Sequence, residues 1–143
     1  MSENNLNDCK LVQLLKIQSE RKGSLTPVYN NYDVPFDISR LYYLYDIPHG
    51  SVRGGHAHKN LEQLIIAVTG SFDLIINDSK EEKIFSLNNP TIGLYVPSMI
   101  WRELKNFSSG AICLVIASNK YDESDYIRDF VEYKNSVKNI SKF

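Results

Sequence analysis

Short runs of aliphatic, β-branched and aromatic residues recur along the whole 143-residue chain and constrain its fold more than any other feature. The runs start at intervals of about ten residues and are separated by Gly, Pro, Asn and Asp, a pattern typical of all-β sandwiches and barrels. It predicts strands at residues 10–17, 25–29, 40–45, 54–58, 63–69, 71–76, 83–87, 93–96, 101–104 and 111–118.

The pattern changes after Ser118. Acidic residues that could cap a helix occupy positions 122–125, and apolar residues follow at helical spacing. This segment predicts one short C-terminal helix. The length fits a single domain, 1–143, with a packed core from about residue 10 to about residue 134.

The charges are balanced: 16 Lys and Arg face 17 Asp and Glu, for a formal net charge of -1. No basic field is present to hold a nucleic acid or an anionic membrane. No apolar run approaches the roughly 18 to 20 residues of a membrane span, so we expect a cytoplasmic protein. Cys9 and Cys113 lie far apart without metal-ligand spacing and are expected to be reduced.

Two histidines lie in the segment RGGHAHK, residues 53–59. Side chains two positions apart on a strand point to the same face, so His56 and His58 converge on one spot. The preceding glycines, Gly54 and Gly55, permit close approach of another group, which suits a ligand cavity. Such a pair presents two metal ligands or an acid–base couple, while an exposed polar strand face is the plainer alternative.

The region from residue 50 to residue 102 resembles the cupin superfamily. The glycine and histidine positions of the first cupin motif are filled by Gly50, His56, His58 and Gly70. The resemblance implies an all-β fold, a cupin or double-stranded β-helix (jelly-roll) barrel, here followed by the short C-terminal helix.

Two of the four metal-ligand positions of cupins carry other residues. Gln63 stands where a metal-binding cupin has glutamate, and Arg102 replaces the histidine of the second motif. Strand alternation turns the neighbouring Glu62 to the opposite face. A guanidinium cannot ligate a metal ion and repels it, so we expect no metal and no other cofactor. The histidines, with an unperturbed pKa of about 6.5, are then suited to general acid–base chemistry.

Six blocks spread over nearly the whole chain are similar to the 3,4-ketoisomerases that act on dTDP-4-oxo-6-deoxyglucose. They are RKGSLTP (21–27), VPFDISRLYYLYD (34–46), RGGHAHK (53–59), EQLIIAVTGS (62–71), GLYVPSMIWRE (93–103) and ASNKYDESDYIRDF (117–130). The resemblance implies a metal-independent isomerase that exchanges the C4 ketone and C3 hydroxyl of the sugar through an enediol. The dTDP-3-oxo-6-deoxyhexose product would be aminated to a 3-amino-3,6-dideoxyhexose for a surface glycan such as an O-antigen.

The resemblance assigns catalytic roles to three residues. The family's two active-site histidines match His56 and His58, one as the C3 base and the other as a proton relay, without deciding which is which. Tyr42 matches the family's site tyrosine, and a phenol can donate a hydrogen bond to a developing oxyanion. Tyr43 and Tyr45 are expected in an aromatic core stripe instead.

Five further residues are candidates for binding the substrate. A diphosphate needs cations at fixed positions, for which Arg40, Arg53 and Lys59 are suited, although each could be a solvated surface charge. Gln63 and Tyr95 are expected on strands that line the same cavity. There an amide and a phenol could bind the sugar or the pyrimidine.

Two positions differ, within this family, between enzymes that give gluco and galacto products. Arg102 resembles the gluco type. Lys22 matches neither type, because it is cationic where the gluco type tends to carry a tyrosine. We include both among the substrate-binding residues and slightly favour a gluco product.

Two other functions remain open: a metal-dependent cupin enzyme and a non-catalytic cupin that binds a nucleotide sugar. The apolar segment LVQLLKI (11–17) lies outside the cupin motifs. Because small barrels leave strand edges and a sheet face exposed, we expect a homodimer in which this N-terminal strand is exchanged between subunits.

Overall fold

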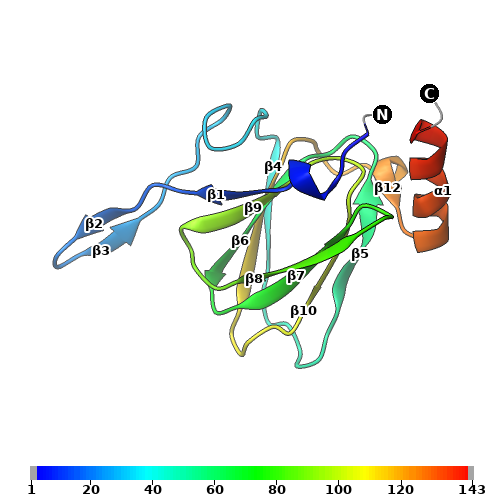
Figure 1. The fold of residues 1–143 in the computed structure, drawn as a ribbon. Helices are drawn as coiled ribbons and strands as arrows, with labels where there is room; N and C mark the ends of the chain where they lie inside the picture. Colours follow the sequence, from blue (N-terminus) through cyan, green and yellow to red (C-terminus); the bar gives the residue numbers. More distant parts are fainter. Residues whose placement is uncertain (1–2, 142–143) are drawn as a thin grey trace.

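The computed structural model describes residues 3–141 and contains two five-stranded antiparallel sheets that enclose a barrel (Figure 1). The first sheet has the order β1-β9-β6-β11-β4 and the second β12-β5-β10-β7-β8, while a hairpin, β2-β3, projects from the barrel. The strands are β1 (Lys10–Gln13), β2 (Ile17–Ser19), β3 (Gly23–Leu25), β4 (Arg40–Leu44), β5 (Arg53–His58), β6 (Gln63–Thr69), β7 (Phe72–Asn77), β8 (Glu82–Leu87), β9 (Ile92–Val96), β10 (Trp101–Lys105), β11 (Ile112–Ala117) and β12 (Tyr126–Ile127).

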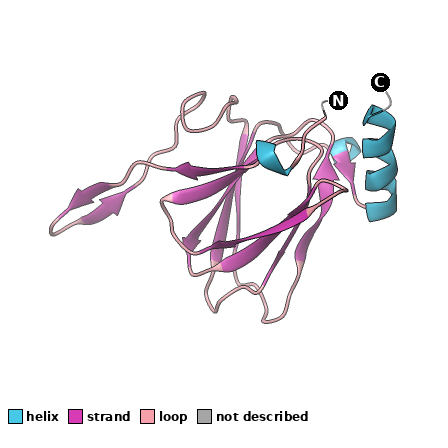
Figure 2. Ribbon diagram, viewed as in Figure 1, coloured by secondary structure: helices cyan, strands magenta, loops and turns pink. Residues whose placement is uncertain are grey.

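Helix is confined to the outside of these sheets (Figure 2). Two 3-10 turns, η1 (Leu6–Asp8) and η2 (Glu123–Asp125), lie near the two ends of the chain, and the single α-helix, α1 (Phe130–Ser141), follows β12. None of these helices is long and apolar enough to cross a membrane. Cys9 and Cys113 are buried, unpaired thiols whose pKa is raised by burial to about 12.

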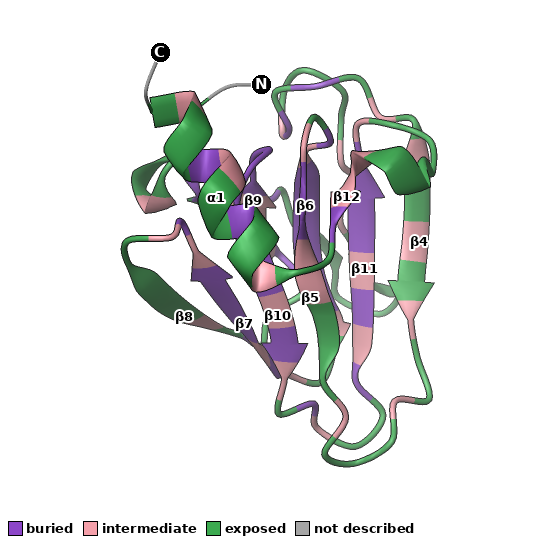
Figure 3. Cartoon of the chain, turned by 90° about the vertical axis from the view of Figure 1, so that its right-hand side faces the viewer, coloured by how far each residue is buried: buried purple, intermediate pink, exposed green. Residues whose placement is uncertain are grey.

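The main core lies between the two sheets and follows from strand alternation. Ile65 of β6, Leu94 of β9 and Val115 of β11 point inward from the first sheet. Leu74 of β7 and Leu104 of β10 meet them from the second sheet, and all five are buried. Strands β6, β7 and β11 are accordingly buried along most of their length, whereas β8 is largely exposed (Figure 3).

The outer face of the first sheet carries a second apolar cluster. Leu64, Ile66 and Ile116 are covered there by side chains of the loop between β3 and β4. The cover does not extend over the edge strand β4, whose outward Leu41 and Tyr43 are 55% and 57% exposed. This face therefore retains apolar surface that a partner could cover.

Helix α1 closes the other side of the barrel. Its Tyr133 and Val137 are buried in a third cluster with Ala57 and Trp101. The Tyr133 hydroxyl lies 2.9 Å from the carbonyl oxygen of Met99, which satisfies the polar end of a fully buried phenol. The helix thereby supports the ends of β5 and β10 that carry the candidate site.

The structure confirms the β-rich barrel and the C-terminal helix but corrects two predicted strands. The stretch 10–17 is not one strand: β1 ends at Gln13, and the Leu14 N–H donates to the Thr91 carbonyl before the chain leaves for β2. The stretch 25–29 is not a strand beyond Leu25. Pro27 lacks the N–H that a sheet ladder would require there.

The acidic segment 122–125 does not start the C-terminal helix. Asp122 caps the 3-10 turn η2 by accepting from the Ser124 N–H, and the next two residues form β12 against β5. Helix α1 begins only at Phe130. Buried Cys9 and Val137 lie just outside the expected core limits of about 10 and 134.

Candidate active site

A cavity of about 470 Å³ opens between the two sheets. Its polar side chains come from both sheets and from the segment after β11. They are Arg40, Tyr42, His56, Gln63, Arg102 and Tyr126, with the exposed Arg53 and Arg128 at the rim.

Strand β5 brings the histidines to this cavity. Gly54 and Gly55 have φ values of 84° and 71°, which other residues rarely adopt. A Cβ at Gly54 would lie 3.0 Å from the Arg102 carbonyl oxygen, so glycine lets β5 approach β10 closely. The resulting register places Arg102 opposite His56. The close approach that the sequence predicted for this step is made at Gly54 by strand β10.

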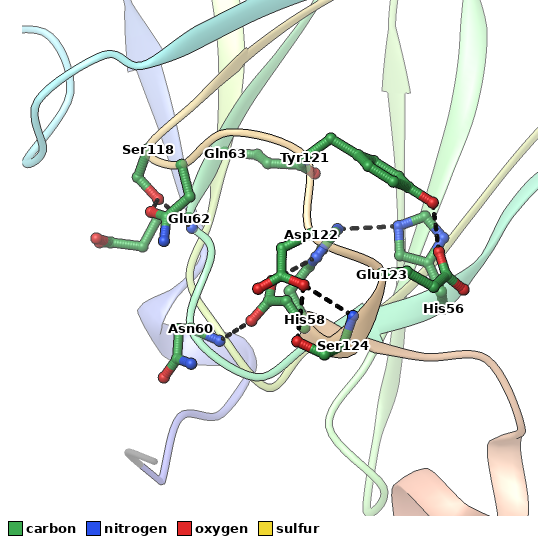
Figure 4. Close-up of polar contacts among 12 residues, drawn as sticks. His56, His58, Asn60, Glu62, Gln63, Ser118, Tyr121, Asp122, Glu123 and Ser124 are labelled. Carbon is green, nitrogen blue, oxygen red and sulfur yellow. Dashed lines mark hydrogen bonds and ion pairs between the residues drawn. The ribbon is translucent and has the colours of Figure 1, made fainter.

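His56 and His58 are in direct contact (Figure 4). Their Nε2 atoms lie 3.1 Å apart, and their rings are nearly perpendicular at 87°. His56 lines the cavity, whereas the His58 side chain is 0% exposed. His58 Nδ1 lies 2.9 Å from Oδ2 of Asp125. The three side chains therefore form a continuous chain from a carboxylate to the cavity.

These contacts fix the ring protons when both imidazoles are neutral. The Asp125 carboxylate can only accept, so His58 carries its proton on Nδ1 and a lone pair on Nε2. The Nε2–Nε2 contact then requires the proton of His56 on Nε2. Nδ1 of His56 is left with a lone pair, and this buried atom makes no hydrogen bond among residues 3–141. His56 therefore has a buried basic nitrogen without a side-chain partner among the described residues, while the backbone of Gly54 favours protonation of the ring.

Burial and nearby positive charge favour the neutral form of both histidines. Burial, followed by the positive charge of Arg102, lowers the pKa of His56 to about 3. The same two causes lower the pKa of His58, with further contributions from His56 and Arg40. A neutral imidazole is the form that can accept a proton from a substrate.

A second hydrogen-bonded chain starts from Arg102 and ends on the facing sheet. Arg102 Nη1 donates to Gln63 Oε1 at 2.6 Å, and Gln63 Nε2 donates to the Tyr42 hydroxyl oxygen at 3.2 Å. Since a guanidinium only donates, Arg102 fixes the orientation of the amide. The phenol accepts from Gln63, so its own proton is available to the cavity. Burial raises the pKa of Tyr42, which keeps that proton in place.

The side chains do not fit the metal site that many cupins have. The oxygen of Gln63 is occupied by Arg102, whose buried guanidinium also donates to the Ile100 carbonyl from Nε at 3.2 Å and Nη2 at 2.9 Å. A divalent cation beside His56 would meet this fixed positive charge. Within the described chain, no group of three or more His, Cys, Asp or Glu side chains is arranged to hold a metal.

Arg40 presents unpaired donors at the cavity. Its Nε and Nη2 are buried and make no hydrogen bond among the described residues. The guanidinium carbon lies 5.2 Å from the ring centre of Tyr42 and 5.8 Å from that of Tyr121. Buried donors of this kind suit an anionic ligand that would complete their hydrogen bonds.

Three predicted binding residues lie outside this cavity. Tyr95 pairs with Leu64, which belongs to the outer cluster, so its side chain points outward and its hydroxyl donates to Glu62. Lys59 follows the last residue of β5 and lines a separate polar depression with Glu62. Lys22 is exposed in the turn between β2 and β3, away from the barrel of its own chain.

The sequence prediction missed three residues of the site. Asp125 contacts His58, and the Tyr126 ring centre lies 4.9 Å and 4.4 Å from those of His56 and His58. The guanidinium carbon of Arg128 lies 4.2 Å from the ring centre of Tyr126. The acidic stretch 122–125 was the available signal, but its capping pattern predicted a helix start. Only the pairing of β12 with β5 brings it to the histidines.

A jelly-roll barrel in which one strand carries two adjacent histidines beside a cavity between the sheets defines a cupin-type protein. The chain belongs to the family described as FdtA, WxcM-like, C-terminal, whose model matches residues 7–138. This confirms the cupin fold and the ketoisomerase family predicted from the six sequence blocks.

The relatives are sugar-nucleotide isomerases. TDP-4-oxo-6-deoxy-alpha-D-glucose-3,4-oxoisomerase of Aneurinibacillus thermoaerophilus is 39% identical over 92% of this chain and 94% of its own length. The TDP-quinovose 3,4-ketoisomerase of Campylobacter jejuni is 48% identical, with a TM-score of 0.87 over 91% of this chain and 99% of that one. A variant 3,4-ketoisomerase of Thermoanaerobacterium thermosaccharolyticum, in complex with TDP-4-keto-6-deoxyglucose, is 38% identical, with a TM-score of 0.90 over 94% and 97%.

Proposed function

We propose that this protein is a 3,4-ketoisomerase that converts TDP-4-oxo-6-deoxyglucose to a TDP-3-oxo-6-deoxyhexose by proton transfer. The single observation that carries the proposal is the cavity with two neutral, touching histidines on one wall and a protonated phenol on the other. The named substrates of the relatives support the choice of sugar nucleotide.

His56 is the C3 base in the proposed reaction because its side chain lines the cavity, whereas that of His58 is fully buried. It takes the proton from C3, and the electrons of that bond form a C3–C4 double bond while the C4 oxygen becomes an enolate. Tyr42 donates a hydrogen bond to this oxygen. The O3 proton then passes to the C4 oxygen, and a proton from the histidine pair reaches C4, so that C3 becomes the ketone and C4 carries the hydroxyl. Each proton-transfer group of this kind is typically worth about 10² to 10⁴ in rate.

His58 is the relay, because it is shielded from the cavity and contacts His56 through Nε2. A proton gained at Nδ1 of His56 can be balanced by release of the Nε2 proton to His58. Proton movement within the pair thus needs no ring rotation. After its protons have exchanged with solvent, the pair can deliver a proton to C4 by the reverse path.

Arginines bind the diphosphate in this proposal. Arg40 supplies buried donors without protein partners, and Arg53 supplies an exposed cation at the rim. Arg128, which the sequence prediction did not include, lines the same cavity. The negative charge of the bound diphosphate would offset the cationic contribution that lowers the pKa of His56 in the free protein.

The reaction proceeds without a metal, and it gives the gluco product. The first point is supported by Gln63 and Arg102 at two cupin ligand positions. The gluco product is supported by Arg102, which resembles the gluco type of the family. It is also supported by the 48% identity to a TDP-quinovose 3,4-ketoisomerase, since quinovose is 6-deoxyglucose. The 3-oxo product is suited to amination, which would yield a 3-amino-3,6-dideoxyhexose for a surface glycan.

The protein acts as a homodimer with exchanged N-terminal segments. Leu15, just before the projecting β2-β3 hairpin, and Ile17 and Leu25 within it are 55%, 52% and 60% exposed. The outer face around Leu41 is also apolar. Lys22 at the hairpin turn could then contribute only to the partner's site. Light scattering should give twice the chain mass, and a monomer at micromolar concentration would contradict this.

The function is tested with purified protein dialysed against a chelator and analysed for residual metal. We expect conversion of TDP-4-oxo-6-deoxyglucose to a 3-oxo sugar, followed by proton NMR, which also gives the C4 configuration. Activity only after addition of Fe, Mn, Ni or Zn would favour a metal-dependent cupin enzyme. Binding without turnover by the folded protein would favour a non-catalytic nucleotide-sugar-binding cupin.

A further inference from the structure

We propose that Asp125 is a positioning residue that sets the ring tautomers of both histidines and provides the counter-charge when they hold the substrate proton. The inference rests on the proposed ketoisomerase function. Its basis is the unbroken chain Asp125–His58–His56, in which the two contacts measure 2.9 Å and 3.1 Å.

The carboxylate of Asp125 is held rigidly from both sides. Oδ1 accepts the Asn60 N–H at 2.7 Å while Oδ2 accepts from His58. The backbone carbonyl of Asp125 accepts the Lys59 N–H at 2.8 Å, and the next residue, Tyr126, pairs with His58 across β12 and β5. The side chain is only 11% exposed. Both oxygens therefore face donors, and an ionised carboxylate satisfies both.

The tautomers follow from this arrangement. With Asp125 accepting from Nδ1 of His58, the lone pair falls on Nδ1 of His56, as derived above. When the C3 proton reaches that nitrogen and the Nε2 proton of His56 moves to His58, the positive charge resides on the imidazole beside Asp125. No charge is created or lost in the pair beyond the one proton taken from the sugar. The carboxylate is thus placed where the transferred charge arrives.

The variant Asp125→Asn exchanges the tautomers of both histidines while nearly preserving the shape of the side chain at position 125. The amide oxygen must face the Asn60 N–H, because the amide nitrogen there would oppose a second donor. The amide N–H then faces Nδ1 of His58 and forces its proton to Nε2. The contact between the two Nε2 atoms in turn forces the proton of His56 to Nδ1, and this nitrogen then has no lone pair to accept a proton.

We expect kcat to fall by about 10² to 10⁴ in Asp125→Asn with KM changed less than about threefold, as for other wrong-tautomer variants. The matched control is Asp122→Asn, the same change three residues earlier, where asparagine can still cap η2. This control should retain full activity. Equal losses in the two variants, or full activity in Asp125→Asn, would overturn the proposal.

The tautomers can be measured without substrate by long-range ¹H–¹⁵N NMR of ¹⁵N-histidine-labelled protein. The wild type should show the Nδ1–H form for His58 and the Nε2–H form for His56, with single His→Asn variants giving the assignments. Asp125→Asn should exchange the two forms. A wild type with any other pair of tautomers overturns the proposal even if the variant fails to fold. An inactive wild type with the expected tautomers would refute the ketoisomerase function but not the positioning role.

Discussion

The two walls of the cavity differ in what their side chains can do with a proton. The wall built on β5 presents two imidazoles, each able to accept or donate, with a carboxylate behind them. The facing wall presents Gln63 and Tyr42, ordered by Arg102 from β10. Each side chain of this second chain donates a hydrogen bond and keeps its proton. In the proposed reaction, the histidine wall takes up the proton and the facing wall stabilises the enolate oxygen.

Burial has opposite consequences on the two walls. It lowers the pKa of His56 and raises that of Tyr42, so both side chains are neutral near pH 7. A neutral imidazole is a base, whereas a neutral phenol is a hydrogen-bond donor. One physical cause, loss of water around each group, thus prepares a base and a donor in the same cavity.

Removing the base should have the largest effect. His56→Asn keeps a polar side chain of similar size but cannot accept the C3 proton, so kcat should fall by about 10³ or more. Binding of the TDP-sugar, measured by calorimetry, should change little. A variant with more than a tenth of wild-type activity would contradict the assignment of His56.

The donor wall should matter less than the base wall. Tyr42→Phe removes one hydrogen bond to the enolate oxygen and should lower kcat by about 10² to 10³. KM should remain within about threefold, because the interaction strengthens mainly in the transition state. If KM rises while kcat stays constant, Tyr42 binds the ground state instead.

A smaller effect is expected from disturbing the order of the donor wall. In Gln63→Glu the new carboxylate would pair with Arg102 and accept a hydrogen bond from the Tyr42 hydroxyl, which would then no longer point into the cavity. We expect kcat to fall by about tenfold. Glu62→Gln, one residue away on the outer face, is the matched control and should be fully active. Comparable losses in both variants would show that the strand, not the hydrogen-bonded chain, is responsible.

The pKa difference at His56 also predicts a pH effect on stability. The folded-state pKa of about 3 lies below the unfolded value of about 6.5, so between these pH values the unfolded chain binds more protons. Stability should therefore fall as the pH is lowered from about 7 toward 3, by up to about 1.4 kcal/mol per pH unit from this group. Urea denaturation should show a shallower pH dependence in His56→Asn. Identical slopes would contradict the neutral state of His56.

The sequence predicted the placement of the two histidines better than that of the other site residues, for physical reasons. His56 and His58 are two residues apart on one strand, so alternation alone places them on one face. Tyr95 was misplaced because its face depends on which residue of β6 it pairs with, and that is Leu64. Asp125 was missed because it reaches His58 across 67 positions through a strand pairing that its capping pattern does not reveal.

The most direct test follows hydrogen isotopes through the reaction. Chelator-treated protein is incubated with TDP-4-oxo-6-deoxyglucose in D₂O, and the 3-oxo product is examined by NMR and mass spectrometry. A proton transfer through the histidine pair predicts metal-free conversion with deuterium at C4. Product that retains the substrate's C3 protium at C4, or conversion only with added metal, would contradict the acid–base account.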